Sequence, residues 1–250
     1  MRSAEIVVED VVITEAIEGM SPGLYGALAR PAGDGPWPAV VLVHEAFGID
    51  EVMRRQVIRM ARAGYLVLMP DLFAAGGSRR CLRATFRALS DGHGRAFDDI
   101  EAARRQLLSR DDCTGRIGVL GFCMGGGFAL VAAARGFDVS SVNYGMLPTN
   151  LDAVLGSACP IVASYGGRDR YLRGSAAKLD AAADRAGLSH DVKEYADAGH
   201  SFLNDAPNGP AAMRPLMELV IGAGPEPESA ADAWRRIEKF FAANLADPKL

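Results

Sequence analysis

The residue with the clearest chemical potential in this chain is a cysteine flanked by glycines. The stretch 121–127 reads Gly-Phe-Cys-Met-Gly-Gly-Gly, which places Cys123 in a G-x-C-x-G frame. That frame is the nucleophile-elbow pattern with sulfur in place of the usual serine oxygen. Glycine tolerates strained backbone and close strand–helix approach, and the N-terminus of a following helix favours a thiolate. The alternative interpretation is a glycine-rich turn that holds an ordinary buried cysteine.

An acid and a base follow Cys123 in the chain. Asp169 comes after Gly-Gly-Arg and His200 comes after Gly199, each directly after a predicted strand. Alone, Asp169 could cap a turn, and His200 could be a structural loop histidine. The order nucleophile, acid, histidine is that of a hydrolase triad on a parallel sheet. The other histidines, His44, His93 and His190, lack such partners, and we interpret them as structural or surface residues.

These residue types predict covalent acyl transfer. Cys123 would attack a carbonyl as thiolate. His200 would take or supply the proton and later activate water, and Asp169 would orient its imidazole. The backbone N–H of Met124 and one from the loop 44–48, expected to be that of Ala46, would form an oxyanion hole.

The elements that must position these residues alternate between strands and helices from residue 39 onward. This alternation predicts an α/β fold with a mostly parallel sheet and helices on both faces. Two earlier strands are expected to form an antiparallel hairpin at one edge. The predicted strands span residues 5–17, 24–29, 39–43, 65–69, 116–120, 139–144, 160–165 and 190–195.

The helices are predicted from their periodicity and end signals. Asp50 should cap a helix that reaches about Ala63, and Ser229 should cap a final helix that reaches about Ala243. Residues 149–158 are expected to be a loop or short helix, and 204–228 an irregular segment near the site. The other predicted helices span residues 97–108, 128–134 and 175–185.

Composition limits the classes of function. A chain of 250 residues accommodates one domain over 1–250. A formal net charge of -4 argues against nucleic-acid partners. The four cysteines are widely spaced, which favours neither a disulfide framework nor a metal site. The N-terminus lacks the apolar core of a signal peptide and no stretch is long enough to span a membrane, so we expect a cytoplasmic protein.

Five motifs together resemble the dienelactone hydrolase family, over nearly the whole chain. They are His44-Glu-Ala-Phe-Gly48, Pro70-Asp-Leu-Phe73, Gly121-Phe-Cys-Met-Gly-Gly126, Gly166-Gly-Arg-Asp169 and Gly199-His-Ser-Phe202. The resemblance implies an α/β-hydrolase fold without a cofactor or metal. It also implies that Glu45 corresponds to a glutamate that holds the nucleophile and helps to ionise it; otherwise Glu45 is an exposed loop carboxylate.

The chain departs from that family at two positions that bind a substrate carboxylate. Ala75 and Asn204 stand where the family's dienelactone-cleaving members have arginines. Arg79, Arg80 or Arg83 could substitute for them. Arg80, Arg83 and Arg87 also recur at helical spacing, which is typical of a solvated helix face.

The sequence therefore predicts a hydrolase of small lactones or esters that works through an acyl-Cys123 intermediate, as a monomer or small homo-oligomer. One alternative is a carboxylesterase or thioesterase with a different acyl substrate. Another is a non-enzymatic binding or redox module that uses Cys123.

Overall fold

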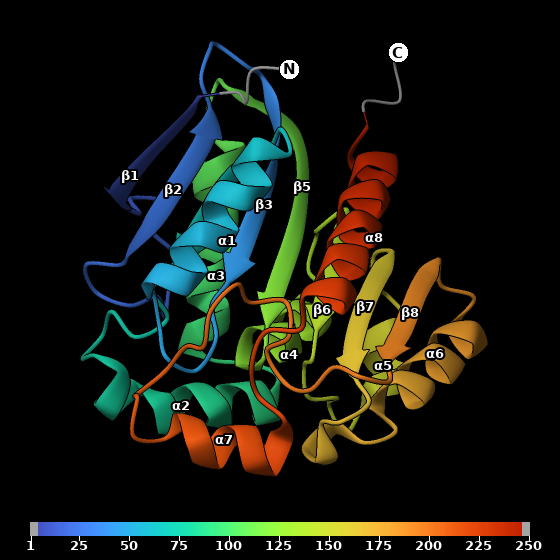
Figure 1. Cartoon of the computed structure of the whole chain (residues 1–250). Helices are drawn as coiled ribbons and strands as arrows, with labels where there is room; N and C mark the ends of the chain where they lie inside the picture. The colour runs from blue at the N-terminus through green and yellow to red at the C-terminus, as the bar shows by residue number, and fades with distance from the viewer. Residues whose placement is uncertain (1–4, 247–250) are drawn as a thin grey trace.

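A computed structural model describes residues 5–246, in which eight strands form one sheet in the order β1-β2-β4-β3-β5-β6-β7-β8 (Figure 1). The first two pairings, β1 with β2 and β2 with β4, are antiparallel, and the others are parallel. This confirms the mostly parallel sheet with an N-terminal hairpin at one edge. The strands are β1 Ile6–Val12, β2 Tyr25–Pro31, β3 Trp37–Val43, β4 Leu66–Pro70, β5 Cys113–Phe122, β6 Val139–Asn143, β7 Ile161–Gly166 and β8 His190–Tyr195.

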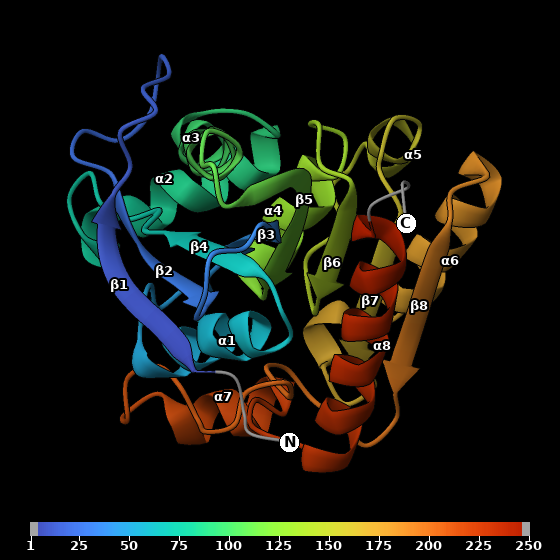
Figure 2. The same ribbon diagram turned by 90° about the horizontal axis from the view of Figure 1, so that it is seen from above.

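Helices cover both faces of the sheet. Figure 2 shows α1 and α8 on one face and α3 and α4 on the other. Helices α2 and α7 lie at the end of the molecule where the parallel strands finish (Figure 1). No helix in residues 5–246 combines the length and the apolar character needed to cross a membrane. The helices are α1 Glu51–Arg62, α2 Ser78–Asp91, α3 Arg95–Leu108, α4 Met124–Ala132, α5 Leu151–Leu155, α6 Ser175–Ala186, α7 Arg214–Ile221 and α8 Pro227–Leu245, with a 3-10 turn η1 at Arg170–Leu172.

Strand register gathers the ends of the central strands at one edge. Val43 pairs with Gly121, and Phe122 pairs with Asn143. The residues that follow these pairs, Glu45, Cys123 and Tyr144, therefore emerge next to one another. Chemistry in open parallel sheets collects at this carboxyl edge, and the register explains why residues distant in sequence meet here.

Helix α4 approaches the strand ends more closely than a side chain would permit. A Cβ on Gly121 would lie 1.9 Å from the carbonyl oxygen of Gly125. A Cβ on Gly125 would lie 2.1 Å from the carbonyl oxygen of Val43. Only glycine allows this contact, so the glycines of the predicted elbow have the packing role expected of them.

The structure corrects the expected start of the last helix and the description of the segment before it. The cap of α8 is Glu226, not Ser229: the Glu226 carboxylate accepts the Ser229 N–H at 2.7 Å. The segment 204–228 is not wholly irregular, because it contains α7, which has Pro215 in its first turn and ends at Gly222 in a left-handed conformation. Helix α7 buries none of its residues, and the prolines and glycines around it in the sequence favoured the prediction of an irregular segment.

One buried carboxylate ties the segment between β1 and β2 to helix α3. Asp99 accepts the Ser21 backbone N–H at 2.6 Å and the Ser21 hydroxyl at 2.8 Å. Burial raises the pKa of Asp99 to about 6, although both bonds from Ser21 oppose that increase. The folded state therefore holds a proton on this group at a pH where the unfolded chain has lost it.

This shift predicts a pH dependence of stability. The pKa of Asp99 is raised on folding, so its contribution to the free energy of unfolding should decline as the pH rises from about 4 to about 6. Asp99→Asn should remove that decline, as measured by urea unfolding across this pH range. Asp111→Asn, an exposed change just beyond the end of α3, is the matched control and should keep the wild-type slope. An unchanged slope in Asp99→Asn would contradict the assignment.

Candidate active site

Cys123 lies at the turn between β5 and α4 in a conformation that L-residues rarely adopt. It is the residue before the first turn of α4, with φ 54° and ψ -117°. Its own N–H donates to the Asn143 carbonyl at 3.0 Å, and its carbonyl accepts the Gly126 N–H at 3.0 Å. These bonds hold the strained backbone, which turns the partly exposed sulfur away from the sheet.

His200 and Asp169 form the second part of the site. The Nδ1 atom of His200 lies 2.6 Å from Oδ2 of Asp169, and both residues are buried. The other carboxylate oxygen of Asp169 accepts the Tyr171 N–H at 3.0 Å, which fixes the acid at the start of η1. The backbone of His200 is held by its N–H, which donates to the Ile221 carbonyl at 3.0 Å. The expected acid–base pair is therefore brought together.

Cys123 and Asp169 together set the charge of His200. Burial alone would lower the pKa of His200, because it disfavours the imidazolium. The interaction with Cys123 and the hydrogen bond to Asp169 outweigh burial and hold the pKa of His200 well above its usual value. His200 is therefore coupled to both Cys123 and Asp169.

Glu45 is buried, contrary to the interpretation of it as an exposed loop carboxylate. Its side chain is 1% exposed and accepts hydrogen bonds from four neutral donors. Burial raises the pKa of Glu45, while the bonds from Asn208, Asn204 and Ser201 and the charge of His200 oppose the increase. The donors are Tyr144 Oη at 3.3 Å, Ser201 Oγ at 3.2 Å, Asn204 Nδ2 at 3.2 Å and Asn208 Nδ2.

Three of these four donors were not predicted from the sequence, and two of them have unusual backbone conformations. Tyr144 has φ 40° and Ser201 has φ 59°; with Cys123 they are the non-glycine residues of positive φ in residues 5–246. The ring of Tyr144 also packs against His200, with centroids 5.0 Å apart. Nothing in the local sequence indicated these roles, because each depends on contacts between segments that lie far apart in the chain.

The two backbone donors expected at an oxyanion hole flank the nucleophile. Met124 is the first residue of α4, so its N–H belongs to the first turn and has no partner within the helix. Ala46 lies in the loop after β3, three residues beyond Val43, which pairs with Gly121 in the sheet. Both positions suit the expectation, which stays a prediction about the bound state.

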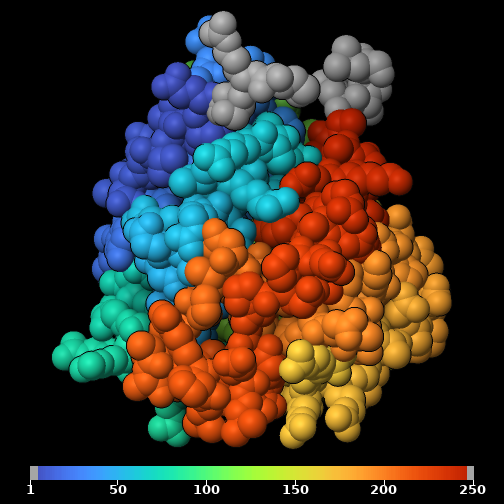
Figure 3. All heavy atoms as spheres, viewed as in Figure 1, coloured from blue at the N-terminus to red at the C-terminus, as the bar shows by residue number. Residues whose placement is uncertain are grey.

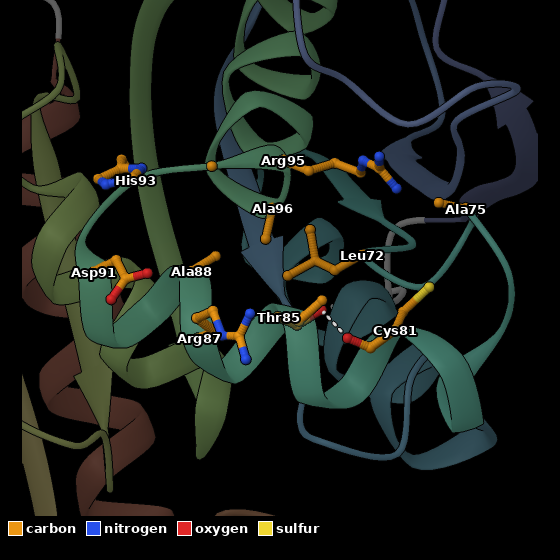
Figure 4. Close-up of a pocket in the computed structure, with 12 residues that line it drawn as sticks. Leu72, Ala75, Cys81, Thr85, Arg87, Ala88, Asp91, His93, Arg95 and Ala96 are labelled. Carbon is orange, nitrogen blue, oxygen red and sulfur yellow. Dashed lines mark hydrogen bonds between the residues drawn. The ribbon is translucent and has the colours of Figure 1, made fainter.

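The residues considered for substrate binding lie in different places. Arg79 lines a cavity of about 780 Å³ together with Ala46, whereas Arg80 and Arg83 are exposed on α2 and do not line it. Asn204 is engaged by Glu45. Ala75 borders a separate cavity of about 350 Å³ between α2 and α3, beside Cys81 and Leu72 (Figure 4).

Two other histidines have contacts that explain them structurally. His44 is buried, and burial lowers its pKa; its Nε2 accepts the Leu72 N–H at 3.1 Å as a neutral ring. His190 lies 3.2 Å from Asp180 and 3.7 Å from Asp184, the one group of possible metal ligands found in the described part of the chain. Polar contacts between the histidine ring and these carboxylates account for that group, which lies on α6 and β8 and not among the residues around Cys123.

Substitution of Asn208 tests the hydrogen bonding around Glu45 through its effect on stability. Asn208→Ala would leave Oε2 of Glu45 buried without its donor, which should lower the free energy of unfolding by about 1–3 kcal/mol. The loss should grow as the pH rises through the raised pKa of Glu45, because removing this donor raises that pKa further and penalises the charged form. Urea unfolding at neutral and acidic pH measures both effects.

The matched control for this test is Asp205→Asn. Asp205 lies on the same segment but pairs with Arg55 at the surface, where both side chains are largely solvent-exposed. Such exposed pairs contribute little, typically under about 1 kcal/mol. Equal losses from Asn208→Ala and Asp205→Asn would contradict the buried network around Glu45.

Comparison with known proteins places this geometry in context. The model of the dienelactone hydrolase family matches residues 24–245. A carboxymethylenebutenolidase from Pseudomonas putida is 29% identical over 205 residues, covering 78% of this chain and 87% of that protein. A carboxymethylenebutenolidase from Rhodococcus opacus is 28% identical over 244 residues, covering 91% of this chain and 88% of that protein.

Solved structures share the fold at lower identity. A dienelactone hydrolase-like promiscuous phosphotriesterase from metagenomic libraries superposes with a TM-score of 0.75 at 19% identity, covering 96% of this chain and 99% of that one. Esterase 2 of Thermogutta terrifontis has a TM-score of 0.63 at 16% identity, covering 99% of this chain and 97% of that one. These likenesses show that the fold is that of the α/β-hydrolases.

Proposed function

The chain belongs to the dienelactone hydrolase family, and from that premise we propose that it hydrolyses lactones or esters through an acyl-cysteine on Cys123. The observation that carries the proposal is the combination of the strained Cys123 backbone with the His200–Asp169 pair at 2.6 Å. Hydrolysis by these residues needs only water as a co-reactant. The names of the two carboxymethylenebutenolidases support the same class of reaction.

The first half of the reaction forms the thioester. The Cys123 sulfur attacks the carbonyl carbon, and the developing oxyanion accepts the N–H groups of Met124 and Ala46. When the carbon–oxygen bond breaks, the imidazolium of His200 gives its proton to the departing alkoxide. The raised pKa of His200 supports this role, because the proton is already present before attack.

The second half consumes water. His200, now neutral, takes a proton from a water molecule whose oxygen attacks the thioester carbonyl. The carbon–sulfur bond breaks, the acid is released, and Cys123 and His200 return to their charged pair. Asp169 keeps the imidazole ring oriented throughout, through its bond to Nδ1.

In this proposal Glu45 stabilises the charged form of His200. Its carboxylate is held by neutral donors, so the nearest positive charge that favours its ionised form is that of His200. A negative Glu45 in turn favours the imidazolium. We therefore assign Glu45 an electrostatic role toward His200 in the resting enzyme.

Substitution of the nucleophile tests the proposal. Cys123→Ala should reduce turnover of a 4-nitrophenyl ester by at least roughly a thousandfold, because the covalent route is lost. The measurement is steady-state kinetics, with thermal unfolding to confirm the fold. Cys81→Ala removes another partly exposed thiol and should keep wild-type turnover. Wild-type turnover in Cys123→Ala would show that the thiol is not the nucleophile.

A further inference from the structure

A large cavity begins beside the proposed oxyanion donor. It measures about 780 Å³ and lies between the N-terminal ends of α1 and α2 and the segment 206–214. Figure 3 shows the side of the molecule on which atoms of the segment 204–222 form the surface below α1. Ala46 lines the cavity, so a substrate whose carbonyl oxygen accepts the Ala46 N–H has a substituent within reach of it. The volume falls in the range of sites that enclose drug-sized ligands.

The cavity wall is mainly apolar. Phe47 forms part of the wall. The segment 206–214 packs against the Phe47 ring at Gly209, where an added Cβ would lie 2.6 Å from the ring. Met213 lies on the wall and is 48% exposed, so it contributes little to the packing of the core. The apolar residues along the cavity are Ala46, Phe47, Val52, Leu82, Ala206, Pro207, Pro210 and Met213.

The charges around the cavity offset one another. Arg55 is paired with Asp205 at 2.6 Å. Of the other charged groups of the lining, Arg79 and Arg214 are matched in number by two acids, Asp50 and Glu51, so the lining taken together with Asp205 has no net charge. This electrostatic balance gives little attraction to an anionic substrate.

Ala75 and Asn204 stand at the two positions where the resemblance leads one to expect carboxylate-binding arginines, and neither supplies a positive charge. The side chain of Asn204 is buried and donates to Glu45. Ala75 borders the separate cavity shown in Figure 4, which lies between α2 and α3. Neither of these two positions therefore places a positive charge at the site.

We infer that the enzyme prefers neutral esters that carry a bulky apolar group, such as a bicyclic aromatic ring, and that this group occupies the cavity between α1, α2 and the segment 206–214. This inference rests on the proposed function, because it places the reacting carbonyl at Cys123 and Ala46. The apolar group can belong to the acyl side or to the alcohol side of the ester. A cavity of this type rewards added apolar surface by roughly tenfold or more in kcat/KM.

Two substrate series distinguish the acyl side from the alcohol side. The acyl series compares 4-nitrophenyl acetate, 4-nitrophenyl 2-naphthoate and the anionic 4-nitrophenyl hemisuccinate. The alcohol series compares phenyl acetate, 1-naphthyl acetate and 4-carboxyphenyl acetate. We expect the naphthyl member of one series to exceed its small neutral partner in kcat/KM by about tenfold or more, and the anionic member to give no gain.

Filling the cavity tests its location. Leu82→Trp should reduce kcat/KM for the preferred naphthyl substrate at least about tenfold more than it reduces kcat/KM for the acetate. Met213→Trp, at an exposed position of the same wall, gives a second test if the first variant does not fold. Leu216→Trp is the control: Leu216 is 61% exposed on α7 and lies outside the cavity lining, so kinetics should match the wild type.

The outcomes separate the two claims. A preference for the anionic esters, or equal kcat/KM across both series with Cys123-dependent turnover of the acetates, would overturn this inference and leave the proposed function intact. A naphthyl preference that survives both tryptophan substitutions would place the apolar group elsewhere and also overturn it. Absence of Cys123-dependent turnover with all six esters would overturn the proposed function, and this inference with it.

Discussion

The site depends on one packing constraint, the contact between α4 and the ends of β3 and β5. Glycines at 121 and 125 allow this contact, and it forces Cys123 into a positive φ of 54°. The strand register then places Glu45 and Tyr144 beside the cysteine. Strained non-glycine backbone in residues 5–246 is confined to Cys123, Tyr144 and Ser201, all of which surround the Glu45–His200 region. Strain concentrated in this way is typical of preorganised sites.

Around that backbone, burial and hydrogen bonding shift the pKa values of His200 and Glu45. Burial disfavours the imidazolium of His200, yet the interaction with Cys123 and the bond to Asp169 keep its pKa high. Glu45 has only neutral donors on its oxygens and depends on His200 for compensation. In the proposed mechanism, this proton on His200 is the one that the leaving group takes up.

Sequence patterns predicted the scaffold and the principal residues because these depend on local signals. Glycine spacing marked the turn at Cys123, and apolar runs marked the parallel strands, whose ends carry Asp169 and His200. The shell around Glu45 was not predictable: Asn208 and Tyr144 reach it only through the tertiary fold, and a buried loop carboxylate has no local signature. Helix α7 was not predicted because the segment around it is rich in proline and glycine. The cap of α8 is Glu226, whereas serine is the residue type that caps helices more commonly, which favoured Ser229.

The central claim is that hydrolysis proceeds through a thioester on Cys123, and trapping that species tests it most directly. Wild-type protein mixed with 4-nitrophenyl acetate would be quenched in acid at successive short times and its peptides mapped by mass spectrometry. We expect an acetyl group on the peptide containing Cys123 that forms before steady-state turnover and disappears as substrate is exhausted. Turnover with no acetyl group on Cys123, together with a stable adduct on another residue or none, would show that hydrolysis does not proceed through Cys123.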